Sequence, residues 1–382
     1  MSATVFVTVV DLSTISGSGV ATREIIRGVG AVSDDRLVVL CPEPTDAFPD
    51  RLKAIVDEFV FLPEMTNPGS PRWHLQMEVS ILRKLWTVLR TENPSVVVTR
   101  LSPSTLFPTP LCKLFNVPHV LLIRGWVRRQ DEYGGTKFGR GVEELVRMNV
   151  RLSTNVYVAF DELKTWIDPY RGGSQSPVEV LPNAVDPTLF SSQSIGEARS
   201  EIGIETDDFI VGFVGSLAPR HEVSTLLHAA SHLDDVELLL VGDGELREEL
   251  EQLATDLGIQ DRVIFTGQVP HERVPTYIAS FDAGYGVVSP GKASNPIKCY
   301  EYLACERPVI TSQKDEFEFV SEIDTGEVVE SVSSEGVQNA IKRLQRRSQA
   351  DRLAAGERGR RYVRQHHTWE AVGERILEDR EQ

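Results

Sequence analysis

Short apolar runs alternate along the whole chain with patterns in which apolar residues recur every three or four positions. Runs of strand length include residues 36–40, 119–123 and 209–214. Helical spacing appears between them, for example over residues 75–90 and 142–152. Because strands alternate with helices, the pattern predicts α/β architecture with a parallel sheet that is covered on both faces.

This rhythm is interrupted once, near the middle of the chain. The proline-bounded segment 182–187 and the polar stretch 191–200 separate two series of strand and helix signals. A length of 382 residues also favours two domains over one. We therefore expect domains at residues 1–187 and 188–364, followed by a final amphipathic helix within residues 365–382.

A glycine-rich turn follows the first apolar run. Gly17 and Gly19 stand just before a helical pattern, and small residues there would let a ligand approach backbone N–H groups. A dinucleotide fingerprint needs a third glycine, but Thr22 occupies that place, so a nicotinamide cofactor is poorly supported. An ordinary helix-entry turn fits the same residues.

The stretch from residue 289 to residue 312 is the strongest candidate for chemistry. Its polar loop leads into a helix whose first turn suits Pro296, and then into a buried strand. Lys298 and Glu301 are three residues apart and would share a helix face. A cation for a diphosphate and a carboxylate for sugar hydroxyls would suit a sugar nucleotide. A solvated helix face with one ion pair fits these residues equally well.

Charge and cysteine content narrow the classes of function. The formal net charge is −16, with 56 acidic and 40 basic residues, so we expect no nucleic-acid partner. Only 9 of the basic residues are lysines, and such an acidic, lysine-poor surface hints at a salt-adapted host. The four cysteines are scattered through apolar segments and predict reduced core thiols: Cys41, Cys112, Cys299 and Cys305.

No apolar run reaches the length of about 18 to 20 residues that a membrane-spanning helix needs. The first residues read as a strand without a basic leader, so a cytoplasmic protein is expected, with the cytoplasmic face of a membrane as a second location.

Several ordered segments of the second half resemble one enzyme family. They include FVGSLAPRHE, LLLVGDGELREEL and PIKCYEYLACERPVI, and PNAVDPTLF at the boundary is similar to the PNGVD-x-x-x-F segment of that family. The chain thus resembles the family-four, or group-one, retaining glycosyltransferases of the GT-B fold. The resemblance implies two Rossmann-like, doubly wound parallel-sheet domains that face a central cleft, with the last helix packing back toward the first domain.

The resemblance also implies an activity and a site. Such enzymes transfer a sugar from a nucleotide-sugar donor to a glycan or lipid-linked glycan, without a metal or another cofactor. It implies that the donor diphosphate lies near Gly215, Arg220 and Lys298, that Glu301 holds the ribose, and that Val269 and Pro270 meet the base. The remaining donor-binding positions are expected at Gly17, Gly19, Ser216, His221, Gly242, Ser294, Asn295, Pro296 and Ile297.

The chain departs from the family pattern at several of these positions. Ala293 stands where the family's E-x7-E motif has its first glutamate, and Ser216 and His221 replace the usual arginine and lysine. A subset of the family carries G-S-L-x-P-W-H-G, with Arg220 here in the place of the tryptophan, and Lys298 could then supply the missing cation. Glu222 and Glu306 replace glycines, so a positive φ at either would imply strain or a reshaped loop.

In the first half the family often presents a histidine near the reacting sugar. The comparable strand here leads into Arg124 and Trp126 instead. Arg124 is our second catalytic candidate beside Lys298, because it could bind a phosphate on a lipid-linked acceptor. Arg128 and Arg129 extend this basic cluster and, with Trp126, could touch a membrane surface. A solvated arginine set paired with Asp131 and Glu132 is the alternative.

Two other functions stay open from the sequence. The losses at Ala293, Ser216 and His221 would suit a catalytically weak homologue that acts as a binding or scaffold subunit. A sugar-nucleotide epimerase would share the architecture, but it would lack the PNAVD and PIKCYEY segments.

Overall fold

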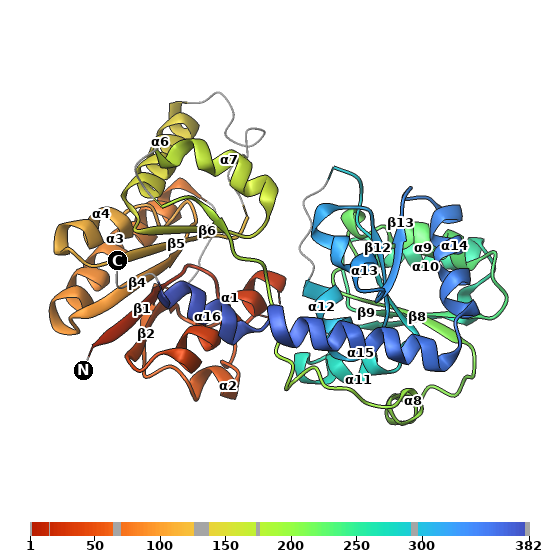
Figure 1. Ribbon diagram of the computed structural model, residues 1–382. Helices are drawn as coiled ribbons and strands as arrows, with labels where there is room; N and C mark the ends of the chain where they lie inside the picture. The colour runs from red at the N-terminus through yellow and green to blue at the C-terminus, as the bar shows by residue number, and fades with distance from the viewer. Residues whose placement is uncertain are drawn as a thin grey trace. The chain divides into compact units, whose positions relative to one another are not determined.

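The computed structural model describes residues 2–14, 16–63, 70–125, 137–172, 176–291 and 297–378 (Figure 1). The chain divides into two compact units, Met1–Asn183 with Trp369–Gln382, and Ala184–Thr368. The boundaries between the units fall after Asn183 and after Thr368, whereas the sequence suggested domain boundaries after residues 187 and 364. Each unit is built on its own parallel sheet. The expected fold class, two doubly wound parallel-sheet α/β domains, is confirmed.

The first unit contains a seven-stranded sheet in the order β3-β2-β1-β4-β5-β6-β7, and every neighbouring pair is parallel. All residues of β1 and β5 are buried, as in strands that are covered on both faces. The strands are β1 Ala3–Val7, β2 Arg36–Pro42, β3 Glu58–Leu62, β4 Pro94–Arg100, β5 His119–Ile123, β6 Asn155–Val158 and β7 Glu179–Val180.

The helices of the first unit include one from the far end of the sequence. The last helix, α16, lies beside α1 (Figure 1), and the two backbones approach closely at Gly28 and Gly373. A Cβ on Gly28 would lie only 2.0 Å from the carbonyl oxygen of Trp369, so this contact requires glycine. The helices are α1 Gly17–Val32, α2 Asp50–Lys53, α3 Pro71–Thr91, α4 Pro108–Phe115, α6 Lys137–Leu152, α7 Asp161–Arg171 and α16 Trp369–Glu378.

The second unit contains a six-stranded parallel sheet in the order β10-β9-β8-β11-β12-β13. Its strands are β8 Phe209–Val214, β9 Val236–Val241, β10 Val263–Gly267, β11 Ala283–Gly286, β12 Val309–Ser312 and β13 Gly326–Val329. Its α-helices are α8 Ile195–Ile202, α9 Val223–Ala230, α10 Arg247–Asp256, α11 Val274–Ala279, α12 Ile297–Ala304, α13 Glu318–Glu322, α14 Ser334–Arg346 and α15 Gln349–His366.

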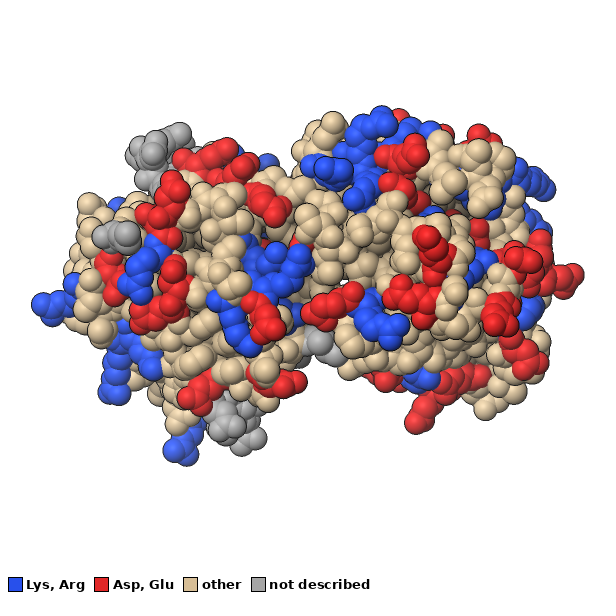
Figure 2. Space-filling view, turned by 90° about the horizontal axis from the view of Figure 1, so that it is seen from below, with Lys and Arg blue, Asp and Glu red and all other residues tan. Residues whose placement is uncertain are grey.

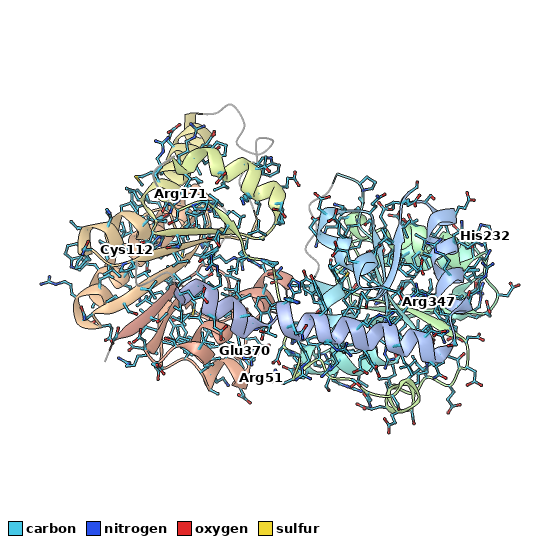
Figure 3. All side chains as sticks on the ribbon, viewed as in Figure 1. Arg51, Cys112, Arg171, His232, Arg347 and Glu370 are labelled. Carbon is cyan, nitrogen blue, oxygen red and sulfur yellow. The ribbon has the colours of Figure 1, made fainter. Side chains whose placement is uncertain are left out.

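The cysteines of both units lie in the core. All four cysteines are buried free thiols, as predicted, and Cys112 is labelled in Figure 3. The guanidinium of Arg171, in the same figure, donates to backbone carbonyls at the ends of neighbouring elements, including those of Val150 and Ser153.

Charged side chains of both signs are interspersed over the face that Figure 2 displays. None of the described helices is long and apolar enough to cross a membrane.

Candidate functional site

The second sheet has a topological switch point between β8 and β11. From β8 the strand order runs outward through β9 to β10, and from β11 it runs the other way through β12 to β13. In open parallel sheets, ligands bind outside the carboxyl ends of the strands at such a point. The loops that follow β8 and β11 meet there, because the N–H of Ser289 donates to the carbonyl oxygen of Arg220 at 3.0 Å.

Tyr302 on α12 ties the two central strands together at this edge. Its hydroxyl accepts a hydrogen bond from the N–H of Val214 at 2.9 Å and lies 3.3 Å from the carbonyl oxygen of Tyr285, to which it donates. The ring covers Gly284, where a Cβ would come within 2.2 Å of it. Tyr302 is not among the site residues predicted from the sequence. Its spacing of four residues from Lys298 is the signal that could have identified it, because i and i+4 share a helix face.

Lys298 is held one turn earlier on α12. Its Nζ lies 4.2 Å from the centroid of the Phe213 ring, in a cation–π arrangement, and 3.1 Å from Nδ1 of His221. The side chain is thus enclosed between β8 and the loop that follows it, which decides against the alternative of a freely solvated helix face. Glu301 lies on the same short helix.

The hydrogen bonds of His221 constrain the proton on Lys298. The Nε–H of Arg220 donates to Nε2 of His221 at 3.2 Å. A neutral imidazole has one acceptor nitrogen, so His221 cannot accept a hydrogen bond from Arg220 and from a protonated Lys298 at the same time. Burial, together with the charge of Arg220, lowers the pKa of Lys298 to about 7. Burial, with the charges of Lys298 and Arg220, lowers the pKa of His221 to about 2, so this ring stays neutral.

Both glutamates that stand in place of family glycines have a positive φ, the case for which strain or a reshaped loop was expected. The angle is 50° at Glu222 and 61° at Glu306. The left-handed backbone at Glu222 is held by surrounding hydrogen bonds. Its carboxylate accepts from Ser289 Oγ at 2.5 Å and from Thr225 Oγ1 at 2.8 Å, and its carbonyl oxygen accepts from Tyr285. The reshaped loop is thereby fixed against β11.

Two glycines let the ends of β8 and β9 approach. Gly215 has φ 138° and Gly242 has φ 130°, and a Cβ on Gly242 would lie 2.1 Å from the carbonyl oxygen of Gly215. Ser216 and Arg220 are exposed beside them, so both are accessible to a ligand. Val269 is partly buried and Pro270 is exposed in the loop after β10, at the edge of the same sheet.

Not all the predicted site residues belong to this unit. Gly17 and Gly19 open α1 in the first unit, where Oγ of the capping residue Ser16 accepts from the N–H of Gly19. Arg124 follows β5 in the first unit, and its guanidinium donates to Leu181 and Asn183. Some predicted positions lie outside the described residues: Ala293, Ser294, Asn295 and Pro296, and in the first unit Trp126, Arg128, Arg129, Asp131 and Glu132.

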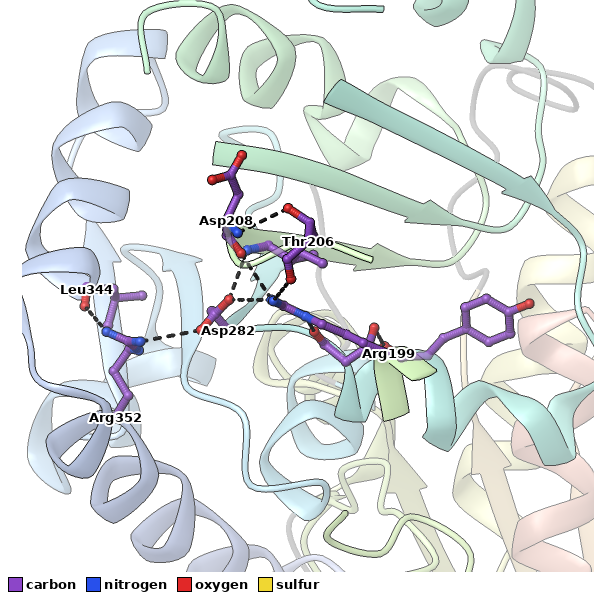
Figure 4. Close-up of polar contacts among 9 residues, drawn as sticks. Arg199, Thr206, Asp208, Asp282, Leu344 and Arg352 are labelled. Carbon is purple, nitrogen blue, oxygen red and sulfur yellow. Dashed lines mark hydrogen bonds and ion pairs between the residues drawn. The ribbon is translucent and has the colours of Figure 1, made fainter. Parts of the chain in front are cut away.

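A polar cavity of ≈ 760 Å³ lies elsewhere in the second unit. Its lining includes Arg199, Asp282 and Arg352, and Asp282 directly precedes β11. The cavity is therefore at the amino ends of the strands, the opposite edge from Lys298 and His221. Its arginines share the Asp282 carboxylate (Figure 4), so we assign these ion pairs a structural role and do not place the ligand site here.

Comparison with known families gives one match within the second unit. Residues 194–362 match the family "Glycosyl transferases group 1". The chain is 28% identical over 221 residues to the GDP-mannose-dependent alpha-(1-6)-phosphatidylinositol monomannoside mannosyltransferase of Mycolicibacterium smegmatis, which covers 54% of this chain and 56% of that protein. The chain spans between 38% and 64% of the length of the curated relatives it matches.

Solved structures match over nearly the whole length. Sucrose-phosphate synthase from Thermosynechococcus elongatus superposes with a TM-score of 0.78 at 17% identity, over 99% of this chain and 98% of that one. Anabaena Alr3699/HepE, solved in complex with UDP and glucose, gives a TM-score of 0.76 at 17% identity over 99% of both chains. These similarities establish the GT-B fold.

Proposed function

We propose that the protein moves a sugar from a nucleotide-sugar donor to a glycan or lipid-linked glycan acceptor. The premise is that residues 194–362 of this chain belong to the group 1 glycosyl transferases. The observation that carries the proposal is the cluster of Arg220, His221 and Lys298 at the switch point of the second sheet. The complex of Anabaena Alr3699/HepE with UDP-glucose supports a nucleotide-sugar donor.

In this proposal the cluster acts on the leaving group. A departing nucleoside diphosphate gains negative charge in the transition state, and positioned cations stabilise that charge. The exposed Arg220 reaches the donor first, and Lys298 becomes protonated against the diphosphate and supplies the second cation. Glu301 binds the ribose hydroxyls. We further propose that the transferred sugar retains its anomeric configuration and that no metal ion takes part.

A turnover assay tests this function. The protein is incubated with UDP-, GDP-, ADP- and dTDP-sugars and a panel of glycan acceptors, and released nucleotide and glycosylated product are both measured. We expect product from one base class, abolished in Glu301→Ala and unaffected by EDTA, and proton NMR of the product should show the anomeric configuration of the donor. Inversion, or a requirement for a divalent ion, would contradict the corresponding part of the proposal.

One observation favours a second candidate function, that of a binding or scaffold subunit. Ser216 and His221 stand where the family has cations, and His221 stays neutral. A scaffold subunit would bind a nucleotide sugar, seen as a higher melting temperature, without turning it over. A ligand at about 100 times its dissociation constant should add roughly 2.7 kcal/mol to the free energy of unfolding. Formation of a new free nucleotide sugar without acceptor would instead identify an epimerase.

We also propose peripheral contact with an anionic membrane surface, and we assign it to the outer face of α3. Leu75, Val79 and Trp86 are exposed there at intervals that keep them on one side of the helix, and Arg83 and Arg90 flank them. The only acidic residue of this helix, Glu78, is buried. Sedimentation with vesicles should recover the protein only when the vesicles contain anionic lipid, and Trp86→Ser with Arg90→Gln should abolish recovery without lowering turnover of a water-soluble acceptor.

A further inference from the structure

Two arginines lie next to each other at the carboxyl edge of the first sheet. Arg100 ends β4, and Arg124 directly follows the neighbouring strand β5. Arg100 pairs in register with Leu122. Because side chains alternate along a strand, Leu122 and Arg124 point to the same face of the sheet, so the two arginines share that face. This edge is where an open parallel sheet presents its ligands.

Each guanidinium is held by neutral groups. Arg100 donates through Nη1 to the carbonyl oxygen of Ser18 at 2.9 Å and to Oγ1 of Thr22, both on α1. Arg124 donates to the carbonyl oxygen of Leu181 at 2.5 Å and to Oδ1 of Asn183. These contacts fix the orientation of both side chains without compensating their charge.

Neither charge is balanced by a carboxylate in the part of the chain that the structure describes, since no ion pair there involves Arg100 or Arg124. An acidic group that precedes α1 in the same unit, Asp11, is already saturated by Ser13 and Thr45, each of which donates through its hydroxyl and its N–H. Burial lowers the pKa of Arg100 to about 10, and burial together with the charge of Arg100 lowers the pKa of Arg124 to about 9.

The second unit offers an internal comparison. Its arginine pair, the buried Arg199 and the partly buried Arg352, shares the carboxylate of Asp282, with N–O distances of 2.8 and 3.4 Å (Figure 4). Buried charges in proteins are normally paired in this way, because removing an ion from water without a counter-charge is costly. Arg100 and Arg124 have the arrangement of such a pair, but no carboxylate of the described residues forms an ion pair with either of them.

Among the described residues, the site stays partly accessible to a ligand. Both arginines are only partly buried, and their neighbours Gly17, Ser18 and Gly125 are exposed and small. A Cβ added to Gly17 or Gly125 would meet nothing within 4 Å among the described atoms. Two uncompensated positive charges match a dianion better than a single carboxylate, and a phosphate monoester carries about 1.5 to 2 negative charges at pH 7. Arginine also binds phosphate oxygens in its planar fork geometry.

We propose that Arg100 and Arg124 form a binding site for a phosphate monoester, and that this phosphate belongs to the acceptor of the transfer reaction. The existence of the phosphate site rests on the geometry of the first unit alone. Its assignment to the acceptor rests on the proposed function.

Calorimetric titration of the full-length chain with glycerol phosphate, at fixed ionic strength, tests the site. The titration is made in the Lys298→Ala background, which removes a competing cation from the second unit. We expect binding whose dissociation constant rises at least tenfold in Arg100→Gln and in Arg124→Gln. Arg36→Gln is the matched control, because Arg36 is an arginine of the same unit that is compensated by Glu58 and Glu92, and it should leave the constant unchanged.

Four outcomes decide the case. An unchanged dissociation constant in Arg100→Gln would overturn the proposal, and so would absence of binding in the Lys298→Ala background when the chain without that substitution binds. If acetate competed as well as methyl phosphate, the ligand of the site would be a carboxylate and not a phosphate monoester. Should Arg100→Gln fail to fold, as a circular-dichroism melting curve would reveal, Arg124→Gln decides by the same criterion.

The assignment to the acceptor has its own readout. With a phosphorylated acceptor and its dephosphorylated counterpart, Arg100→Gln should raise KM only for the first, and an equal effect on both would refute the assignment. Vesicles that carry a lipid phosphate monoester, compared with a water-soluble sugar phosphate, distinguish a lipid-borne from a free source. A chain that binds glycerol phosphate but turns over no nucleotide sugar would retain the site and refute the proposed function.

Discussion

The amine of Lys298 lies 3.1 Å from Nδ1 of His221, whose other ring nitrogen accepts from Arg220. Because one neutral imidazole cannot accept from two cations, the contact with Arg220 competes with protonation of Lys298. Phe213, which faces Lys298 at 4.2 Å, adds a cation–π contact once the amine is protonated. The cluster is thus set to take up a proton when an anion arrives.

Removal of the amine should therefore weaken donor binding. We expect Lys298→Ala to raise the dissociation constant of the nucleotide sugar about tenfold to a hundredfold, since a hydrogen bond to a charged group contributes about 1.5 to 3 kcal/mol. Arg361→Ala, which removes an exposed cation on α15 of the same unit, is the control and should have no effect. Calorimetric titration measures both, and equal affinity in Lys298→Ala and the unsubstituted chain would exclude Lys298 from the donor site.

Donor binding should also depend on pH through this lysine. The pKa of Lys298 is about 7 without ligand, and a bound diphosphate raises it, because an opposite charge favours the protonated amine. Affinity should be fully developed below pH 7 and fall at higher pH, by up to tenfold per pH unit, until the raised pKa is passed.

Titration at pH 8 in buffers of different ionisation enthalpy measures the proton directly. A nucleotide sugar is the suitable ligand, because its diphosphate is esterified at both ends and does not titrate near neutral pH. We expect uptake that approaches one proton for each donor bound, and none in Lys298→Met. Proton release on binding would contradict the assigned state of Lys298.

Tyr302 gives a prediction about the switch point itself. Replacement by phenylalanine keeps the ring over Gly284 but leaves the N–H of Val214 without its partner. We expect Tyr302→Phe to lower the free energy of unfolding by about 1 to 3 kcal/mol, the cost of an unsatisfied buried donor, and to weaken donor binding by loosening the end of β8. Tyr277→Phe, on the less buried side of α11, should change the unfolding curve much less. Equal effects of the two substitutions would show that the hydroxyl of Tyr302 is not specifically required.

Local apolar pattern was enough to predict most of the second sheet. Residues 209–214 form an uninterrupted apolar or small run, residues 236–241 form an apolar run with one glutamate, and these ranges are the bounds of β8 and β9. The strand β13, Gly326–Val329, was missed because it is short and has only two apolar residues, Val328 and Val329. Helix α15 was missed because its buried side consists largely of small residues, Ala355, Gly356 and Gly359, and not of large apolar ones.

The candidate site likewise contains residues that local sequence predicts and contacts that it does not predict. Lys298, His221 and the two positive-φ glutamates could be identified from motif positions. The contact of Lys298 with Phe213 and the bridge made by Tyr302 depend on β8 lying beside β11, and a strand order is set by contacts far apart in the sequence. Arg100 was missed for this reason as well, since its partner Arg124 follows a different strand of the first sheet.

Glu306 provides a prediction about stability that is independent of the proposed function. Helix α12 ends in the paired hydrogen bonds of a Schellman motif, from the N–H of Glu306 to Leu303 and from that of Arg307 to Tyr302. The motif requires a left-handed residue, and Glu306 adopts φ 61° at a cost that glycine would not incur. Its carboxylate lies 3.7 Å from Arg360, a partly exposed pair that contributes little.

We therefore expect Glu306→Gly to raise the free energy of unfolding by about 1 kcal/mol. Glu306→Ala, which removes the carboxylate but keeps the backbone penalty, should raise it by less or lower it. Urea unfolding monitored by circular dichroism compares the variants, and a Glu306→Gly chain no more stable than Glu306→Ala would mean that the left-handed backbone is not strained.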